Sequence, residues 1–342
     1  MEPPAQSPGR MRHRISLVSV GLLLWTLGVH LTNSTIWRIE EAHDTHRALD
    51  WVQATNRVEH RVNLLVGSSN TACSFDPRQL DSLGALDRWY NLGQPGMAGF
   101  ELVDFALRLV EQVNQGEVDA LFVEIIAQDA SQWTPDWRNV QIMEGSSALE
   151  LLRARMTIQA GDASQWDSIR LFAQFMLMKL SAPIHNWLHA TSGDWRQNRQ
   201  GFRTQNELRR LDTSSEVAER ILHKRRAQLE HYRTYLDSGE IEAQEERTQL
   251  AFPVKRLGLL LEKAAAKGIQ VHLFAIPTEQ TEHLHAAITQ TLECPVFVPS
   301  CQPDSSILVD ARFLRDPLHL NRDGAHEMGH LLLNAYSSKS PH

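Results

Sequence analysis

The stretch from Arg61 to Thr71 reads RVNLLVGSSNT, an apolar run that ends in small polar residues. Val62 to Val66 are mostly branched apolar residues, which is typical of a buried strand in a parallel sheet. Gly67, Ser68 and Ser69 follow and favour a turn at the carboxyl end of that strand. Ligands of open α/β sheets bind at this end of the strands, beside the free N–H groups of the next helix. Taken alone, the tripeptide fits either a capping turn or a serine presented for chemistry.

Similar apolar runs recur along the chain and alternate with helical patterns. We expect further strands at 88–92, 120–126, 268–277 and 296–298, and helices at 97–114, 280–291 and 322–336. Strands that alternate with helices predict a parallel sheet covered on both faces. The expected fold class is therefore α/β, a three-layer α/β/α sandwich with a parallel sheet, in one domain spanning residues 61–336.

The segment at about 137–265 interrupts this alternation. It is rich in Arg, Gln, Glu, Trp and Leu and contains no strand-like run. Its pattern predicts helices at 145–158, 164–190, 214–237 and 240–267, so we interpret it as a helical insertion. The tryptophans in or near it either pack in the core or offer aromatic faces to a sugar; they are Trp133, Trp137, Trp166, Trp187 and Trp195.

Residues 15–32, ISLVSVGLLLWTLGVHLT, contain no charged Lys, Arg, Asp or Glu. This run is just long enough to cross a bilayer as a helix. The three arginines between residues 10 and 14 should stay cytoplasmic by the positive-inside rule. We expect a cytoplasmic tail (1–14), a transmembrane signal anchor (15–32), a juxtamembrane segment (33–60) and an extracytoplasmic body on the periplasmic or cell-surface side. A cleaved signal peptide and a buried soluble helix are the alternatives, but no clean small-x-small cleavage site follows.

Composition narrows the function classes. With 342 residues, 42% of them hydrophobic, the chain can bury a sizeable core. The formal net charge is −7 and no basic stripe runs through the sequence, so we expect no nucleic-acid partner. Cys73 is predicted to pack as a small apolar residue. Outside the cytoplasm, Cys294 and Cys301 could pair only if the segment between them doubles back.

A second decisive stretch, DPLHLNRDG at 316–324, lies near the other end of the chain. Asp316 and His319 are three residues apart, a spacing that puts both side chains on one face of a turn. The Asp carboxylate could hold one imidazole nitrogen and leave the other free as a base. A serine nucleophile needs such a base, because its hydroxyl is a poor nucleophile at neutral pH. These residues point to a triad of Ser69, His319 and Asp316.

In these blocks the sequence resembles the SGNH, or GDSL, hydrolase superfamily, over roughly residues 61–130 and 268–336. The usual Gly-Asp-Ser of the first block appears here as Gly67-Ser68-Ser69, which implies Ser69 as nucleophile. The second block is matched by residues 91–96, NLGQPG, which implies Gly96 as an oxyanion-hole residue. The last block, Asp-x-x-His followed by Asn and Gly, is matched within 316–324. The resemblance implies an SGNH/flavodoxin-like sandwich and ester chemistry.

Two departures from the family pattern stand out. Ser68 occupies the place of the usual Asp, and the third block, normally Gly-x-Asn-Asp, reads IAQD at 126–129. Gln128 is either an amide donor of the oxyanion hole, together with the N–H groups of Ser69 and Gly96, or a plain loop residue. These features are similar to the membrane-anchored branch, which includes proteins that O-acetylate alginate and other extracellular polysaccharides and the D-alanine transfer protein of teichoic acids. That branch implies an acyl donor, a carbohydrate acceptor and envelope-assembly partner proteins.

The last predicted helix contains a competing motif, His326-Glu327-Met328-Gly329-His330. H-E-x-x-H on a helix is the signature of zinc proteases, with the Glu as base. No Asp or Glu occurs among the residues after His330, so a downstream acidic ligand is missing. We therefore expect no metal and no cofactor. The resemblance implies an extracytoplasmic SGNH-type serine esterase or O-acyltransferase that acts on acyl esters of envelope or extracellular polysaccharide. The alternatives are a zinc metallopeptidase that uses His326, Glu327 and His330, and a non-catalytic SGNH-like scaffold in envelope assembly.

Overall fold

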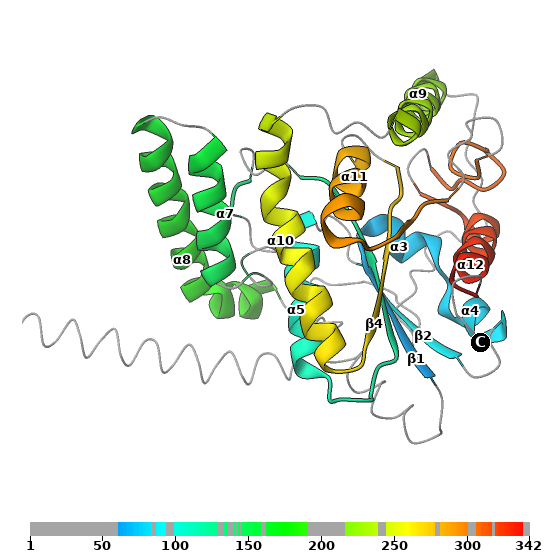
Figure 1. Ribbon diagram of the computed structural model, residues 1–342, viewed down its shortest axis with the longest axis horizontal. Coiled ribbons are helices and arrows are strands. Elements are labelled where there is room, and N and C mark those ends of the chain that lie inside the picture. The colour runs from blue at the N-terminus through cyan, green and yellow to red at the C-terminus, as the bar shows by residue number, and fades with distance from the viewer. Residues whose placement is uncertain are drawn as a thin grey trace, which may run out of the picture.

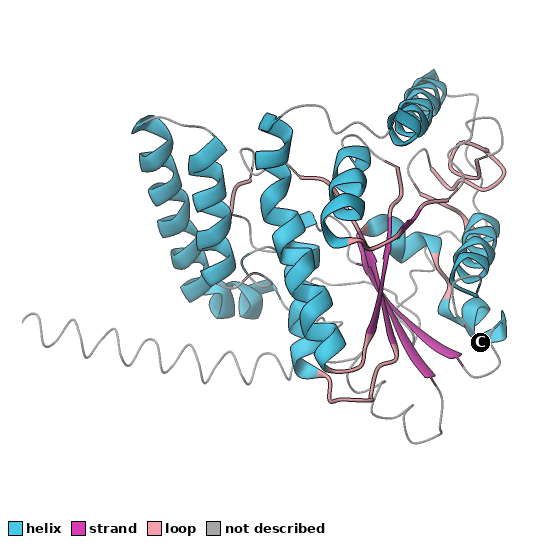
Figure 2. Cartoon of the chain, in the orientation of Figure 1, coloured by secondary structure: helices cyan, strands magenta, loops and turns pink. Residues whose placement is uncertain are grey.

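A computed structural model describes residues 61–83, 87–93, 99–128, 133–135, 140, 143, 145–158, 162–189, 216–238, 244–277, 281–299, 306–316 and 319–337. The strands are β1 (Arg61–Gly67), β2 (Asp87–Gly93), β3 (Ala120–Glu124), β4 (Gln270–Phe274) and β5 (Val296–Phe297). The helices are α3 (Ser69–Ser74), α4 (Pro77–Leu83), α5 (Gly99–Gln112), α7 (Gly145–Ile158), α8 (Asp162–His189), α9 (Glu216–Ser238), α10 (Gln244–Ala266), α11 (Thr281–Leu292) and α12 (Arg322–Ser337). Figure 2 shows the strands in magenta among the cyan helices.

The five strands form one parallel sheet in the order β2-β1-β3-β4-β5. β1 pairs with β2 on one side and with β3 on the other, so Gly67 ends level with Gly93 of β2. Because every strand runs the same way, the segments after β1, β2 and β3 all begin at one edge of the sheet. The predicted α/β class with a parallel sheet is confirmed.

Helices cover both faces of the sheet (Figure 1). One face packs its apolar side chains, such as Leu64 and Val66, against α5, α10 and α11. On the other face, Leu65 and Phe122 pack with side chains of α4, α9 and α12. This arrangement is compatible with a three-layer α/β/α sandwich.

The helices of the segment between β3 and β4 pack in different parts of the protein. α7 and α8 pack against the start of α5 and against α10 through a separate apolar cluster that includes Leu151, Phe175 and Phe252, and Figure 1 shows them set off from the sheet. By contrast, Leu257 and Leu260 of α10 pack directly onto the sheet. Leu222 and Leu229 of α9 belong to the cluster on the opposite face.

The predicted helices and strands are confirmed, with ends that differ by a few residues. Cys73 is buried, as expected. Among the residues that the structure describes, no helix combines the length and apolarity of a membrane span. The predicted anchor at 15–32 and the juxtamembrane segment at 33–60 lie outside the described residues, as does Cys301.

Candidate active site

The turn after β1 places Ser69 at the first position of α3. Ser68 is the N-cap: its hydroxyl accepts a hydrogen bond from the amide of Asn70 at 3.1 Å. Serine is a favoured N-cap residue because its side-chain oxygen satisfies one of the free N–H groups of the first helical turn. As the first helical residue, Ser69 has an amide with no acceptor within its own helix. The turn therefore presents a hydroxyl and an N–H group together at the edge of the sheet.

A buried carboxyl group, Glu124 at the end of β3, supports this turn. Its Oε2 atom accepts hydrogen bonds from the Ser68 amide at 2.7 Å, the Ser68 hydroxyl at 2.9 Å and the Thr71 hydroxyl at 2.6 Å. Burial raises the pKa of Glu124, and the hydrogen bonds from Thr71 and Ser68 oppose that rise. A Cβ atom on Gly67 would lie 2.5 Å from the same carboxylate oxygen, so only glycine fits this position. The carboxyl group comes from β3 rather than from the residue before Ser69.

A tight loop before α12 carries the Asp and His side chains. Leu314 and Leu320 form an isolated antiparallel bridge that closes the loop at its base. Asn321 fastens this base to α12: its side-chain amide donates to the Arg312 carbonyl at 2.7 Å, and its Oδ1 accepts from the Gly324 amide at 3.0 Å. A Cβ on residue 324 would lie 2.3 Å from the Phe313 carbonyl oxygen, which explains the glycine there.

The structure brings Ser69, His319 and Asp316 together. The Nε2 atom of His319 lies 3.0 Å from the Ser69 hydroxyl oxygen. The Nδ1 atom lies 2.9 Å from Oδ1 of Asp316 and 3.0 Å from Oδ2, and the His319 amide also donates to Oδ1 at 3.0 Å. An ionised carboxylate only accepts hydrogen bonds, so Nδ1 carries the proton and leaves Nε2 to accept from Ser69. This is the arrangement of a serine nucleophile with its base and orienting acid.

Two arginines interact electrostatically with the Asp316 carboxylate. Arg315 contacts Oδ2, with both Nε and a terminal nitrogen at 3.2 Å. Arg225 of α9 is buried, and burial lowers its pKa to about 10, while the negative charge of Asp316 acts in the opposite direction. These cations favour the ionised form of a neighbouring carboxylate. α9 thus brings a charged group to the site from a segment with no counterpart in the sequence resemblance.

The predicted oxyanion-hole residues are only partly described. Gly96 lies outside the described residues. Gln128 is described: its Oε1 atom accepts from the Phe100 amide at 3.2 Å, at the start of α5. That bond assigns the side-chain oxygen and leaves the NH₂ group available as a donor. Asn91, in the second block, has a structural role, since its amide donates to the carbonyls of Thr71 and Phe75 at 2.9 and 2.8 Å.

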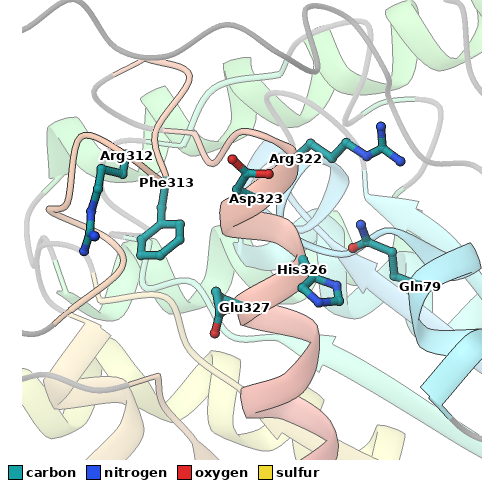
Figure 3. A pocket seen from close by; sticks show the side chains of 7 residues that line it. All are labelled: Gln79, Arg312, Phe313, Arg322, Asp323, His326 and Glu327. Atoms are coloured by element: carbon teal, nitrogen blue, oxygen red, sulfur yellow. The ribbon is translucent and has the colours of Figure 1, made fainter.

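The H-E-x-x-H motif lies elsewhere, on the outer surface of α12. The Nε2 atoms of His326 and His330 are 3.2 Å apart. No third His, Cys, Asp or Glu of the described ranges joins this pair in a group that could hold a metal ion. Figure 3 shows His326 and Glu327 among the side chains that line a cavity of about 380 Å³ between α12, α4 and the segment with Arg312 and Phe313. Ser69 and His319 are not among its lining residues.

The sequence analysis does not identify two residues of the site, Glu124 and Arg225. Glu124 leaves a detectable signal, an acid at the end of the otherwise apolar run ALFVE. Arg225 leaves none, because α9 contains many basic residues and nothing in the sequence distinguishes the buried one.

Neither a scan against protein-family models nor a search of curated proteins finds a match to this chain. The chemistry of the site is therefore inferred from its own residues: a hydroxyl, a base oriented by a carboxylate, and amide donors at the start of a helix.

Proposed function

We propose that the protein is an extracytoplasmic serine esterase or O-acyltransferase of SGNH type that acts on acyl esters of envelope or extracellular polysaccharide. The observation that carries the proposal is the contact of 3.0 Å between the Ser69 hydroxyl and His319 Nε2, with Asp316 behind the imidazole. The nucleophile and its base are 250 residues apart in sequence. A surface serine and histidine have no structural need to meet in this geometry, whereas acyl transfer requires it.

In the proposed reaction, the Ser69 oxygen attacks the carbonyl carbon of an ester while His319 Nε2 takes the hydroxyl proton. The tetrahedral intermediate carries a negative oxygen, which the Ser69 amide at the start of α3 would stabilise, with Gly96 and Gln128 as the further donors. Each such donor contributes on the order of 3 kcal/mol. The intermediate collapses as the imidazolium gives its proton to the leaving alcohol. Water or an acceptor hydroxyl, deprotonated by His319, then attacks the acyl-enzyme and regenerates Ser69.

The sequence resemblance supports an SGNH-type assignment in particular. Its blocks correspond to segments that lie at one edge of the sheet: the turn after β1, the end of β2 and the loop before α12. The buried Glu124 supplies a carboxyl group at the turn where Ser68 departs from the family pattern. The proposal includes a sandwich of SGNH/flavodoxin type, and an anchor at residues 15–32 with the body outside the cytoplasm, as the sequence predicts.

A fluorophosphonate probe, which reacts with activated serines, tests the proposal. We expect the full chain, purified in detergent, to be labelled, and the Ser69→Ala and His319→Ala variants not to be. Ser82→Ala is the matched control, because Ser82 lies exposed on α4 and should label like wild type. Labelling that survives Ser69→Ala would rule out Ser69 as nucleophile. A folded wild type that is never labelled would favour the non-catalytic scaffold.

Transfer to a carbohydrate hydroxyl, rather than hydrolysis, is the outcome that we expect for the acyl-enzyme. A transferase must position its acceptor well or exclude water, since water competes at high concentration. The experiment supplies an activated acetyl ester with and without oligosaccharide and follows acetate release and acetylated sugar by mass spectrometry. Acetate release that no acceptor changes, with no acetylated sugar, would identify a plain esterase.

A further inference from the structure

The contact between α9 and α11 gathers three side chains of the kind that bind metal ions. His231 comes from α9, and Glu282 and His283 come from the first turn of α11. The Oε1 atom of Glu282 lies 3.3 Å from His231 Nε2 and 3.8 Å from His283 Nε2. All three potential ligand atoms lie within 4.8 Å of one another.

The carboxylate in this group is buried. The Glu282 side chain is 6% exposed, and the ion-pair partners that the described chain gives it are the two imidazoles. Buried carboxylates in proteins are paired with a cationic group, hydrogen-bonded or bound to a metal ion. The nitrogen lone pairs of the two imidazoles and the oxygens of the carboxylate can together bind a cation.

The surroundings hold the ligands in place. The ring of Tyr235 contacts the His283 imidazole edge-on, with ring centroids 4.5 Å apart. Next to it, the Tyr232 hydroxyl lies 2.9 Å from Nδ1 of His285, which links the same two helices. The imidazole of His283 is therefore oriented by packing before any ion binds. His231 is 65% exposed, which leaves an open side for a water ligand.

We propose that His231, Glu282 and His283 bind a divalent cation of the zinc class that joins α9 to α11. The ligand atoms of a four-coordinate zinc lie about 3.3 Å apart, given zinc–ligand distances of about 2.0–2.1 Å. The distance of 3.3 Å between Glu282 and His231 already matches this spacing, and the distance of 3.8 Å between Glu282 and His283 is slightly longer. Two imidazoles and a carboxylate, with water in the fourth position, suit zinc better than the oxygen-seeking calcium or magnesium. The proposal departs from the metal-free protein expected from sequence.

The position of α9 gives such an ion a consequence. Leu222 and Leu229 of this helix pack in the same cluster as Leu314 and Leu320, which flank the loop that carries Asp316. Arg225 lies between Leu222 and Leu229 in sequence and is buried. The negative charge of Asp316 acts to raise its pKa. An ion that fixes the far end of α9 to α11 therefore stabilises the helix that brings Arg225 toward Asp316.

The experiment measures zinc directly on the tag-free full chain in detergent. After chelation and reconstitution, we expect about one zinc per chain by elemental analysis, and a melting temperature that zinc raises. His231→Ala should weaken zinc binding by at least about 100-fold, since loss of even a partner of a metal ligand costs about 10- to 100-fold. His231 is largely exposed, so this variant should keep its fold. Circular dichroism checks that it does.

The His326→Ala/His330→Ala double variant is the control, because that exposed pair could also attract zinc. It should bind zinc as wild type does, and so should Ser69→Ala, which separates this site from the proposed catalysis. A wild type that takes up no zinc would overturn the proposal. So would zinc binding that survives His231→Ala or disappears in the double variant.

Discussion

Glu124 places a buried carboxyl group at the turn that carries Ser69, and burial disfavours the charged form of this group. The side chain is 2% exposed, and burial raises its pKa above the ordinary value of 4.5. Its three hydrogen-bond donors, from Ser68 and Thr71, connect β3 to both ends of the first turn of α3. The position of Ser69 therefore depends on a residue of the neighbouring strand.

Replacement of Glu124 by glutamine should change how stability depends on pH. A glutamate whose pKa is raised on folding stabilises the folded state fully below the unfolded pKa, and this contribution is lost as pH rises through the folded pKa. Wild type should therefore lose stability relative to Glu124→Gln as pH rises above about 4.5. Urea unfolding of both proteins between pH 4 and pH 8 measures the difference.

Glu262→Gln is the control for this titration, because Glu262 is exposed on α10 and should change little. A wild type that gains stability relative to Glu124→Gln over the same pH range would contradict the expectation. It would mean that the hydrogen bonds from Ser68 and Thr71 outweigh the cost of burial.

The loop that carries Asp316 and His319 is held by its junction with α12 rather than by the sheet. Asn321 makes the decisive bonds: it donates to the carbonyls of Arg312 and Leu314 and accepts from the Gly324 amide. It thus closes the loop and caps the helix with one side chain. We expect this junction to hold the imidazole at Ser69.

Asn321→Ala should destabilise the protein by about 2 kcal/mol, because it leaves buried carbonyls unpaired and removes the cap of α12. It should also slow fluorophosphonate labelling of Ser69, since the Asp–His loop loses its fixed geometry. Denaturant unfolding and labelling kinetics measure the two effects.

Asn334→Ala, on the exposed face of the same helix, is the control and should be close to wild type in both measurements. Unchanged labelling by a destabilised Asn321→Ala variant would show that the loop is positioned by other contacts.

The whole protein should have one orientation in the membrane if residues 15–32 form the anchor. Arginines before that run favour a cytoplasmic amino terminus and an extracytoplasmic body. A carboxyl-terminal alkaline phosphatase fusion, which is active only outside the cytoplasm, should therefore be active. The same fusion without residues 15–32 should be inactive. A stable but inactive fusion of the full chain would place the body in the cytoplasm and remove the envelope from the proposed function.

The local patterns of this chain are strong enough to predict its elements. The apolar run before Gly67 predicts β1, and residues 145–158, read as a helix, form α7 over the same range. Residues 316–324 predict a turn that holds a carboxylate beside an imidazole, because that contact spans three residues. Periodicity and short-range spacing depend on residues that are close together in the chain, so these elements can be predicted from the sequence.

Contacts between residues that are far apart in the chain cannot be predicted in this way. Ser69 meets His319 across 250 residues because a parallel sheet collects its strand ends at one edge, but sequence spacing does not report that distance. The role of Glu124 under Ser68 and the burial of Arg225 beside Asp316 are likewise products of packing. Pairing between helices far apart in the chain also unites His231 with Glu282 and His283. Only the folded chain decides such partners, since burial and contact depend on how whole elements pack rather than on their neighbours in sequence.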